Sequence, residues 1–125
     1  MKRSVIVLAA LLSISAVSLA KANGKWLEKV PNADKTRVNP YAGQTDAIAA
    51  GRTLFVANCS QCHGQNAEGK GSRPSLRSER IKAATDGDLA WLLKNGDVDK
   101  GMPRWSGLPE QQRWQIISYI RRLNP

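Results

Sequence analysis

The feature that most constrains this chain is the pentapeptide Cys59-Ser60-Gln61-Cys62-His63. Two thiols three residues apart lie on one side of a single helical turn, and an imidazole follows the second thiol directly. This geometry lets each thiol add to one vinyl group of a haem while the imidazole nitrogen coordinates the iron. A C-x-x-C-H sequence signals covalent attachment of haem c. The pentapeptide therefore predicts one haem c, with its iron, attached by two thioethers through Cys59 and Cys62 and ligated by His63.

Three other roles for these thiols are open on the pentapeptide alone. A thioredoxin-like redox pair needs strands alternating with helices, and no convincing run of strands occurs here. A closed zinc site needs four ligands, whereas Cys59, Cys62 and His63 are all the cysteines and histidines in the chain. A disulfide between residues so close would close almost no loop and would stabilise little. Each alternative fits the sequence less well than haem attachment.

The stretch Gly101-Met102-Pro103 predicts the second iron ligand. A lone methionine usually fills space in a core. Met102, however, lies in a loop between glycine and proline, and Met1 belongs to the export signal described below. Met102 follows His63 by 39 residues, which is enough chain to reach the opposite face of a haem. With no second histidine available, we expect Met102 to be the other axial ligand.

Pro74 is the candidate partner of the histidine ring. A metal-bound histidine usually donates its second ring N–H to a carbonyl or carboxylate, which fixes the ring and tunes the metal. We expect the Pro74 carbonyl to accept that hydrogen bond and so to contribute to the cofactor site. The alternative is an ordinary loop proline.

The N-terminus has the pattern of an export signal. Lys2 and Arg3 precede an apolar stretch, and small residues around Ala20 and Ala22 fit a cleavage site. We predict a Sec-type signal peptide over residues 1–22 and a periplasmic location. An uncleaved membrane anchor is the alternative, although the apolar run is short and interrupted by serines. The chain would contact a membrane only if this segment were retained.

Residues 23–45 are predicted to be an irregular N-terminal extension, because prolines and a glycine punctuate them. The spacing of Trp26, Leu27 and Val30 allows one short helical turn. Two interpretations are open. The segment is either a flexible leader or a strap packed on the domain, with Trp26 and Tyr41 as anchors.

Residues 46–125 are predicted to be one all-α domain. Apolar residues recur at helical spacing over 46–58, 81–95 and 108–123. Thr45 or Asp46 is the expected cap of the first helix, and Thr85 or Asp86, with Asp88, that of the second. Pro109 is expected in the first turn of the third helix.

The formal net charge of +9 indicates which kinds of molecule the protein could bind. Without the predicted signal peptide, 16 basic and 10 acidic residues leave 16 − 10 = +6. The basic residues are scattered, so they indicate solubility and attraction to an acidic protein rather than nucleic-acid binding.

With these parts placed, the chain from about Ala47 to Leu123 resembles the class I cytochromes c. The residues that carry the resemblance are Gly51-x-x-x-Phe55, Cys59-x-x-Cys62-His63-Gly64, Pro74-x-Leu76, Gly101-Met102-Pro103, and the final helix with Trp114 and Tyr119. The resemblance implies a haem-centred core in which the first and last helices cross. Gly51 and Phe55 would then meet Ile116 and Tyr119.

The resemblance also implies a function. We expect a periplasmic electron carrier rather than an enzyme, with a dehydrogenase, reductase or oxidase as its acidic partner, and a monomer. The alternative is a haem subunit of a larger dehydrogenase or oxidoreductase complex. Candidates for the docking face neighbour the expected haem loops; they are Lys70, Lys94, Lys100 and Arg104. A purely solvated role for each of them is equally open.

Overall fold

The computed structural model describes residues 24–125, and the predicted signal peptide over residues 1–22 lies outside this part of the chain. The elements in chain order are η2 (Lys25–Lys29), α1 (Asn32–Lys35), α2 (Thr45–Asn58), α3 (Ser60–His63), α4 (Glu79–Ala83), α5 (Asp86–Asn95), η3 (Val98–Lys100) and α6 (Glu110–Leu123). The all-α prediction is confirmed, since the only β structure among the described residues is two isolated bridges. Within residues 24–125, the helices are too short or too polar to cross a lipid bilayer.

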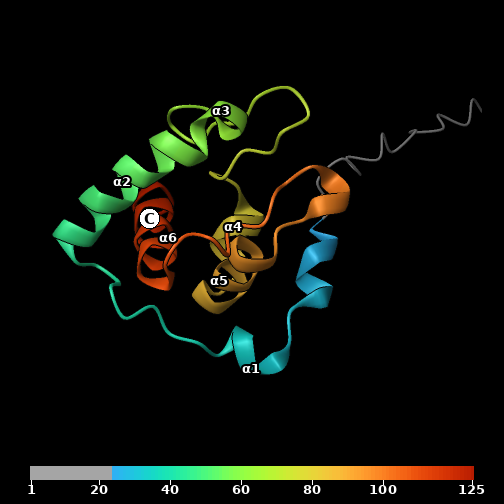
Figure 1. The fold of residues 1–125 in the computed structure, drawn as a ribbon, viewed down its shortest axis with the longest axis horizontal. Coiled ribbons are helices and arrows are strands. Elements are labelled where there is room, and N and C mark those ends of the chain that lie inside the picture. Colours follow the sequence, from blue (N-terminus) through green and yellow to red (C-terminus); the bar gives the residue numbers. More distant parts are fainter. Residues whose placement is uncertain (1–23) are drawn as a thin grey trace, which may run out of the picture.

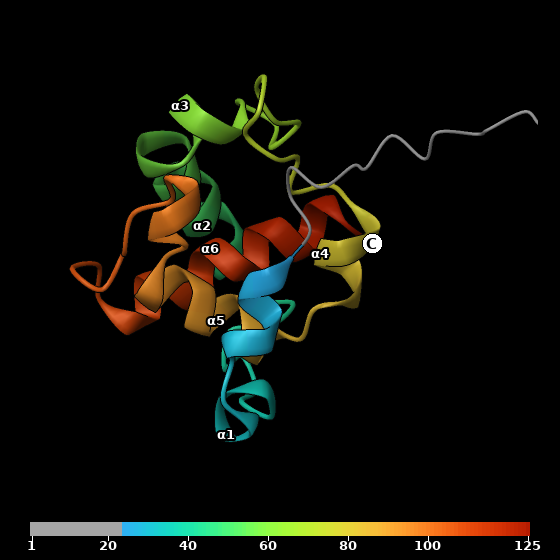
Figure 2. The same ribbon diagram turned by 90° about the vertical axis from the view of Figure 1, so that its right-hand side faces the viewer.

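Helices α2 and α6 pack closely against each other (Figures 1 and 2). A Cβ atom on Gly51 of α2 would lie 1.9 Å from the carbonyl oxygen of Gln115 and 3.1 Å from the Cβ of Tyr119. One turn further along α2, the rings of Phe55 and Tyr119 lie 5.4 Å apart between centroids. The expected contact of Gly51 and Phe55 with Tyr119 is therefore confirmed. The backbone nearest to Gly51 belongs to Gln115, the neighbour of the expected Ile116.

The helical region predicted over 81–95 contains two helices, α4 and α5, and α5 begins at the predicted cap Thr85. Ala84 and Thr85, between α4 and α5, have extended backbone angles. Thr85 caps α5 because its hydroxyl accepts from the Asp88 N–H while the Asp88 carboxylate accepts from the Thr85 N–H, as expected for a capping box. At the other side of the break, the Arg121 guanidinium binds the carbonyls of Ile81 and Ala84. These side chains satisfy the two helix ends and so stabilise the break.

Two predicted helix starts also need correction. Thr45 is the first helical residue of α2, and Gln44 occupies the N-cap position. The N-terminus of α2 has no side-chain capping hydrogen bond. Pro109 is the cap of α6 rather than part of its first turn. The packing of α2 and α6 against each other stabilises both helices without a side-chain cap.

Residues 24–45, called the N-terminal belt below, run around the outside of α5 and α6 before the chain reaches α2 (Figure 1). Asn39 is only 3% exposed, and its side-chain NH₂ donates to the Trp114 carbonyl at 3.3 Å and the Ser118 hydroxyl at 2.9 Å. The Ser118 hydroxyl in turn donates to the Tyr41 carbonyl at 3.2 Å. Trp26 is also buried. The belt is therefore a packed strap, and not a flexible leader.

The belt approaches α5 through a glycine. A Cβ atom on Gly87 would lie 1.9 Å from the carbonyl oxygen of Asp34, so only glycine allows this approach. The Thr85 hydroxyl donates to the Lys35 carbonyl at 2.9 Å. These contacts join the C-terminus of α1 to the N-terminus of α5, where the carbonyls of one helix face the partial positive charge of the other.

Candidate functional site

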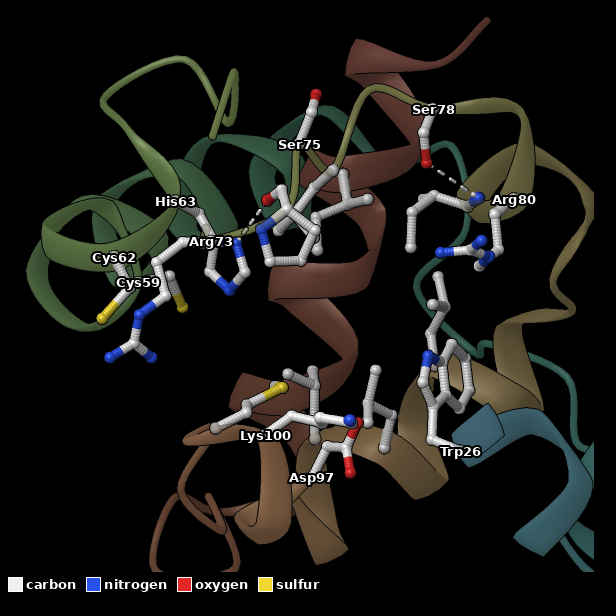
Figure 3. A pocket seen from close by; sticks show the side chains of 18 of the residues that line it. Trp26, Cys59, Cys62, His63, Arg73, Ser75, Ser78, Arg80, Asp97 and Lys100 are labelled. Atoms are coloured by element: carbon white, nitrogen blue, oxygen red, sulfur yellow. Dashed lines mark hydrogen bonds between the residues drawn. The ribbon is translucent and has the colours of Figure 1, made fainter. Parts of the chain in front are cut away.

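A cavity of about 680 Å³ opens between α3, α5, α6 and the loop that follows η3 (Figure 3). Its walls are mainly apolar side chains from both halves of the chain, namely Trp26, Leu76, Ile81, Leu89, Leu92, Leu93, Trp105, Ile116 and Ile120. The five predicted site residues all line the same cavity; they are Cys59, Cys62, His63, Pro74 and Met102. The structure therefore brings together residues that span 44 positions of the sequence.

Helix α3 presents the two thiols and the imidazole. Cys59 ends α2 and begins α3, and its carbonyl accepts from the N–H groups of Cys62 at 3.2 Å and His63 at 2.9 Å. Both cysteines are free thiols. Burial raises the pKa of the Cys59 thiol to about 11, and the neighbouring Cys62 adds to this effect. At neutral pH, Cys59 is therefore a neutral thiol, whose S–H can add across a carbon–carbon double bond.

His63 is held by the loop after α3. Its Nδ1 lies 2.8 Å from the carbonyl oxygen of Pro74. A carbonyl oxygen only accepts hydrogen bonds, so Nδ1 carries the proton in this contact. In the neutral imidazole, Nε2 is then the unprotonated nitrogen, and Figure 3 shows the ring extending into the cavity. The ring is thus fixed in the tautomer that leaves a lone pair available to a metal.

The opposite side of the cavity is formed by the loop that carries Met102. The N–H and carbonyl of Met102 pair with the carbonyl and N–H of Asp97, each at 3.1 Å. This pair of hydrogen bonds closes a tight loop that contains η3. The Trp105 N–H donates to the Leu93 carbonyl at 2.8 Å and so anchors the end of the loop. Asp97 lies across the cavity from the cysteines and His63 (Figure 3). Met102 is partly buried and packs against the apolar core.

The sequence did not predict the polar end of the cavity. Trp26, Ser78 and Arg80 lie at the end away from the cysteines (Figure 3). Ser78 caps α4, because its hydroxyl accepts from the Ile81 N–H at 3.4 Å. The spacing around Trp26 indicated a packed turn, but nothing in the sequence placed it against the cavity. No sequence motif indicated a role for Arg80.

The residues present fit a haem c. A haem is a flat apolar ring with vinyl groups near one edge, carboxylates at the other and an iron in the centre. The cavity has the size of a cofactor site, apolar walls, and two thiols at one end. At the other end, a guanidinium, a hydroxyl and an indole N–H suit carboxylates. His63 lies across the cavity from Asp97, which pairs with Met102, so an imidazole and a thioether could ligate one iron between them.

Known proteins share the part of the chain that builds this site. Residues 46–120 match the family described as cytochrome C oxidase, cbb3-type, subunit III. The chain is 42% identical over 86 residues to cytochrome c-554(547) of Halothiobacillus neapolitanus, in an alignment that covers 60% of this chain and 94% of that protein. The family match begins after the N-terminal belt, so it includes His63 and Met102 but not Trp26.

Two larger proteins contain a similar region. The chain is 33% identical over 98 residues to the quinohemoprotein alcohol dehydrogenase ADH-IIG of Pseudomonas putida, which covers 77% of this chain and 13% of that protein. The crystal structure of cytochrome CL from Methylophaga aminisulfidivorans superposes with a TM-score of 0.60 and 30% identity. That match covers 68% of this chain and 58% of the other.

Proposed function

This chain belongs to the c-type cytochrome family, in which haem c is covalently attached and functions in electron transfer, and we propose that it is a carrier of single electrons between redox proteins of the periplasm. The observation that supports this proposal best is that His63 and Met102 line one cavity, with Asp97, the backbone partner of Met102, across it from His63. With the imidazole of His63 and the thioether of Met102 both bound to it, the iron would have no open position for a substrate.

The proposed roles of the side chains follow from their positions. Cys59 and Cys62 would hold the ring through thioethers, and His63 Nε2 and the Met102 sulfur would ligate the iron. The Pro74 carbonyl would keep the imidazole oriented through the 2.8 Å hydrogen bond to Nδ1. Haem iron supplies a one-electron couple between Fe(III) and Fe(II), and a methionine ligand and burial both raise its reduction potential.

This arrangement favours electron transfer over catalysis. The His63 ring is held by the Pro74 carbonyl and the Met102 backbone by Asp97, so little needs to move when the charge of the iron changes. We therefore infer that the protein is a carrier, which accepts an electron from one protein and passes it to another.

The visible spectrum of the purified protein in both oxidation states tests this proposal. We expect low-spin spectra in both states and a weak long-wavelength absorbance in the ferric state, which reports the iron–methionine bond. A ferric protein without that absorbance, together with rapid binding of carbon monoxide on reduction, would instead indicate a reactive, open haem.

We propose an acidic protein as the partner. Lys70, Lys94, Lys100 and Arg104 are all exposed, and Lys100 lines the cavity itself. Arg73 and Arg80 add positive charge around the same opening. Such a surface would attract an acidic face on a dehydrogenase, reductase or oxidase, and salt would weaken the attraction. Rates of partner reduction that do not fall with ionic strength would exclude this docking mode.

A second candidate function is that of a haem subunit bound permanently to a larger oxidoreductase. It is favoured by the similarity to a segment of a quinohemoprotein alcohol dehydrogenase. Purification from the native source discriminates between the two. A carrier would elute alone as a monomer, whereas a subunit would co-purify with a second protein in a fixed ratio.

A further inference from the structure

One side chain joins the loop that orients His63 to the loop that supplies Met102. The Arg73 guanidinium donates through Nη1 to the Gly101 carbonyl at 3.1 Å, across 28 positions of the sequence. Arg73 immediately precedes Pro74, whose carbonyl accepts from His63. Gly101 immediately precedes Met102. The Arg73–Gly101 bridge thus connects the residue before Pro74, which orients His63, to the residue before Met102.

Both ends of this bridge are fixed to their own loops. The N–H and carbonyl of Arg73 pair with the carbonyl and N–H of Lys70, at 2.8 and 3.2 Å. Met102 is paired in the same way with Asp97, at 3.1 Å in each direction. A movement of the Met102 loop away from the cavity would therefore break the bond to Arg73.

The local geometry makes room for this contact. A Cβ atom on Gly101 would lie 3.3 Å from Nη1 of Arg73, which is tighter than ordinary van der Waals contact. The backbone at Gly101 also has a φ of +85°, which side chains rarely adopt. Figure 3 shows Arg73 at the same edge of the cavity as Cys59 and Cys62. The bridge therefore crosses the edge at which the thioethers would form.

From these observations we propose that Arg73 is a positioning residue, which holds the Met102 loop against the cavity and so keeps the thioether on the iron. The proposal rests on the assignment of Met102 as an axial ligand. It extends that assignment, because Arg73 touches neither iron ligand. A guanidinium suits this role because it is always charged and its hydrogen bond to a carbonyl is stronger than a neutral one.

Competition with imidazole tests the proposal on the intact ferric holoprotein. Added imidazole binds the iron only when Met102 leaves it, so its Kd measures how firmly the loop is held. The variants are Arg73→Gln and, as a matched control, Arg77→Gln. Arg77 is an exposed arginine four residues further along the same loop, outside the cavity lining. Both changes remove one positive charge, and only the first removes the bond to Gly101.

We expect Arg73→Gln to lower the imidazole Kd by about three- to ten-fold, as the loss of one solvent-exposed hydrogen bond implies. Arg77→Gln should stay within about twofold of the unmodified protein. The long-wavelength ferric absorbance should persist in both variants without imidazole. All titrations are made at 25 °C, after far-UV circular dichroism has verified that each variant is folded at that temperature.

Two results would overturn the proposal, and they differ. If the unmodified ferric protein lacks the long-wavelength absorbance, Met102 is not a ligand, and the role of Arg73 falls with it. If that absorbance is present but Arg73→Gln and Arg77→Gln give the same imidazole Kd, the ligand assignment stands and the Arg73–Gly101 bridge has no positioning role.

Discussion

The carbonyl oxygen of Gln115 lies 1.9 Å from the point that a Cβ atom on Gly51 would occupy. A glycine within a helix costs about 1 kcal/mol relative to alanine, and here it permits α2 and α6 to approach at backbone distance. Phe55 and Tyr119 pack one turn further on, with ring centroids 5.4 Å apart. Because α2 leads directly into Cys59, this contact sets where the thiols and His63 lie relative to α6.

The change Gly51→Ala tests that contact. Helix propensity alone predicts a gain of about 1 kcal/mol, whereas the steric overlap requires the helices to separate. We expect the overlap to dominate and the free energy of unfolding to fall by about 2–4 kcal/mol, measured by guanidinium denaturation of the ferric protein. Ala49→Gly, at an exposed position of the same helix, should cost only about 1 kcal/mol. A stabilised Gly51→Ala variant would contradict the close approach.

The change Met102→Leu tests the proposed iron ligation. Leucine conserves most of the side-chain volume but has no sulfur, so the haem should remain attached while the long-wavelength ferric absorbance disappears. We expect the reduction potential to fall by on the order of 0.1 V, a part of the roughly 0.8 V range that axial ligands set. Voltammetry and carbon monoxide binding to the reduced protein measure the change. Unaltered optical and redox behaviour would refute the role of Met102.

The change Trp26→Ala tests whether the N-terminal belt belongs to the cofactor-binding domain. Trp26 lines the cavity and is 8% exposed. Its truncation should lower the free energy of unfolding of the holoprotein by about 3 kcal/mol. Glu28→Ala, at an exposed position of the same 3-10 helix, should change it by less than about 0.5 kcal/mol. Equal effects of the two changes would show that the belt does not support the cavity.

Arg121 and Arg122 offer a matched pair for the junction between α4 and α5. The Arg121 guanidinium binds the Asp86 carboxylate at 2.6 Å, the Ile81 carbonyl at 2.7 Å and the Ala84 carbonyl. Lysine cannot reproduce this planar set of donors, so Arg121→Lys should cost about 1–3 kcal/mol in urea denaturation. Arg122→Lys, at the exposed neighbouring position, should cost less than about 0.5 kcal/mol. An equally small loss of stability in Arg121→Lys would mean that the junction forms without the guanidinium.

The Arg37–Glu110 ion pair predicts a dependence of stability on pH. The hydrogen bond from Arg37 lowers the pKa of Glu110 below its ordinary value of 4.5. A carboxyl group with a lowered folded pKa stabilises the fold above its unfolded pKa, and this contribution is lost as the pH falls through the folded pKa. Both side chains are more than one-third exposed, so solvent screening limits the contribution to about 0.5 kcal/mol.

The corresponding experiment is urea denaturation of the unmodified protein and Glu110→Gln between about pH 7 and pH 2. The unmodified protein should be more stable by about 0.5 kcal/mol above pH 5, and the two should converge at the acid end. Glu79→Gln, on a side chain of α4 that is 90% exposed and pairs with Lys82, is the control. A difference that stays constant down to pH 2 would rule out the ion pair as its cause.

Much of the site could be predicted because its chemistry is local in sequence. The spacing of Cys59, Cys62 and His63 is set by one helical turn, whatever the rest of the chain does. Met102 could be predicted by elimination, since the residues after Met1 contain no other thioether. The assignment of these residues as ligands remains a prediction, but the cavity contains all of them.

The residues that sequence reasoning missed act at long range. Asn39 is buried by contacts with Trp114 and Ser118, more than 70 positions away. Arg121 interrupts a helical pattern by binding carbonyls 37 and 40 positions earlier in the chain. Neither contact has a local signal, because a polar side chain has the same propensity whether its partner is water or a distant backbone carbonyl.

The sequence by itself determined the all-α class, the cofactor and the residues that can bond to it, because covalent reactivity and metal affinity belong to side chains of a given type at a given spacing. Only the tertiary structure decided that the N-terminal belt forms part of the cavity wall, that α4 and α5 are separate, and that Arg73 reaches Gly101. These features depend on which surfaces meet when the chain folds. That is decided by the packing of the whole core and the satisfaction of buried polar groups, which no single stretch of sequence contains.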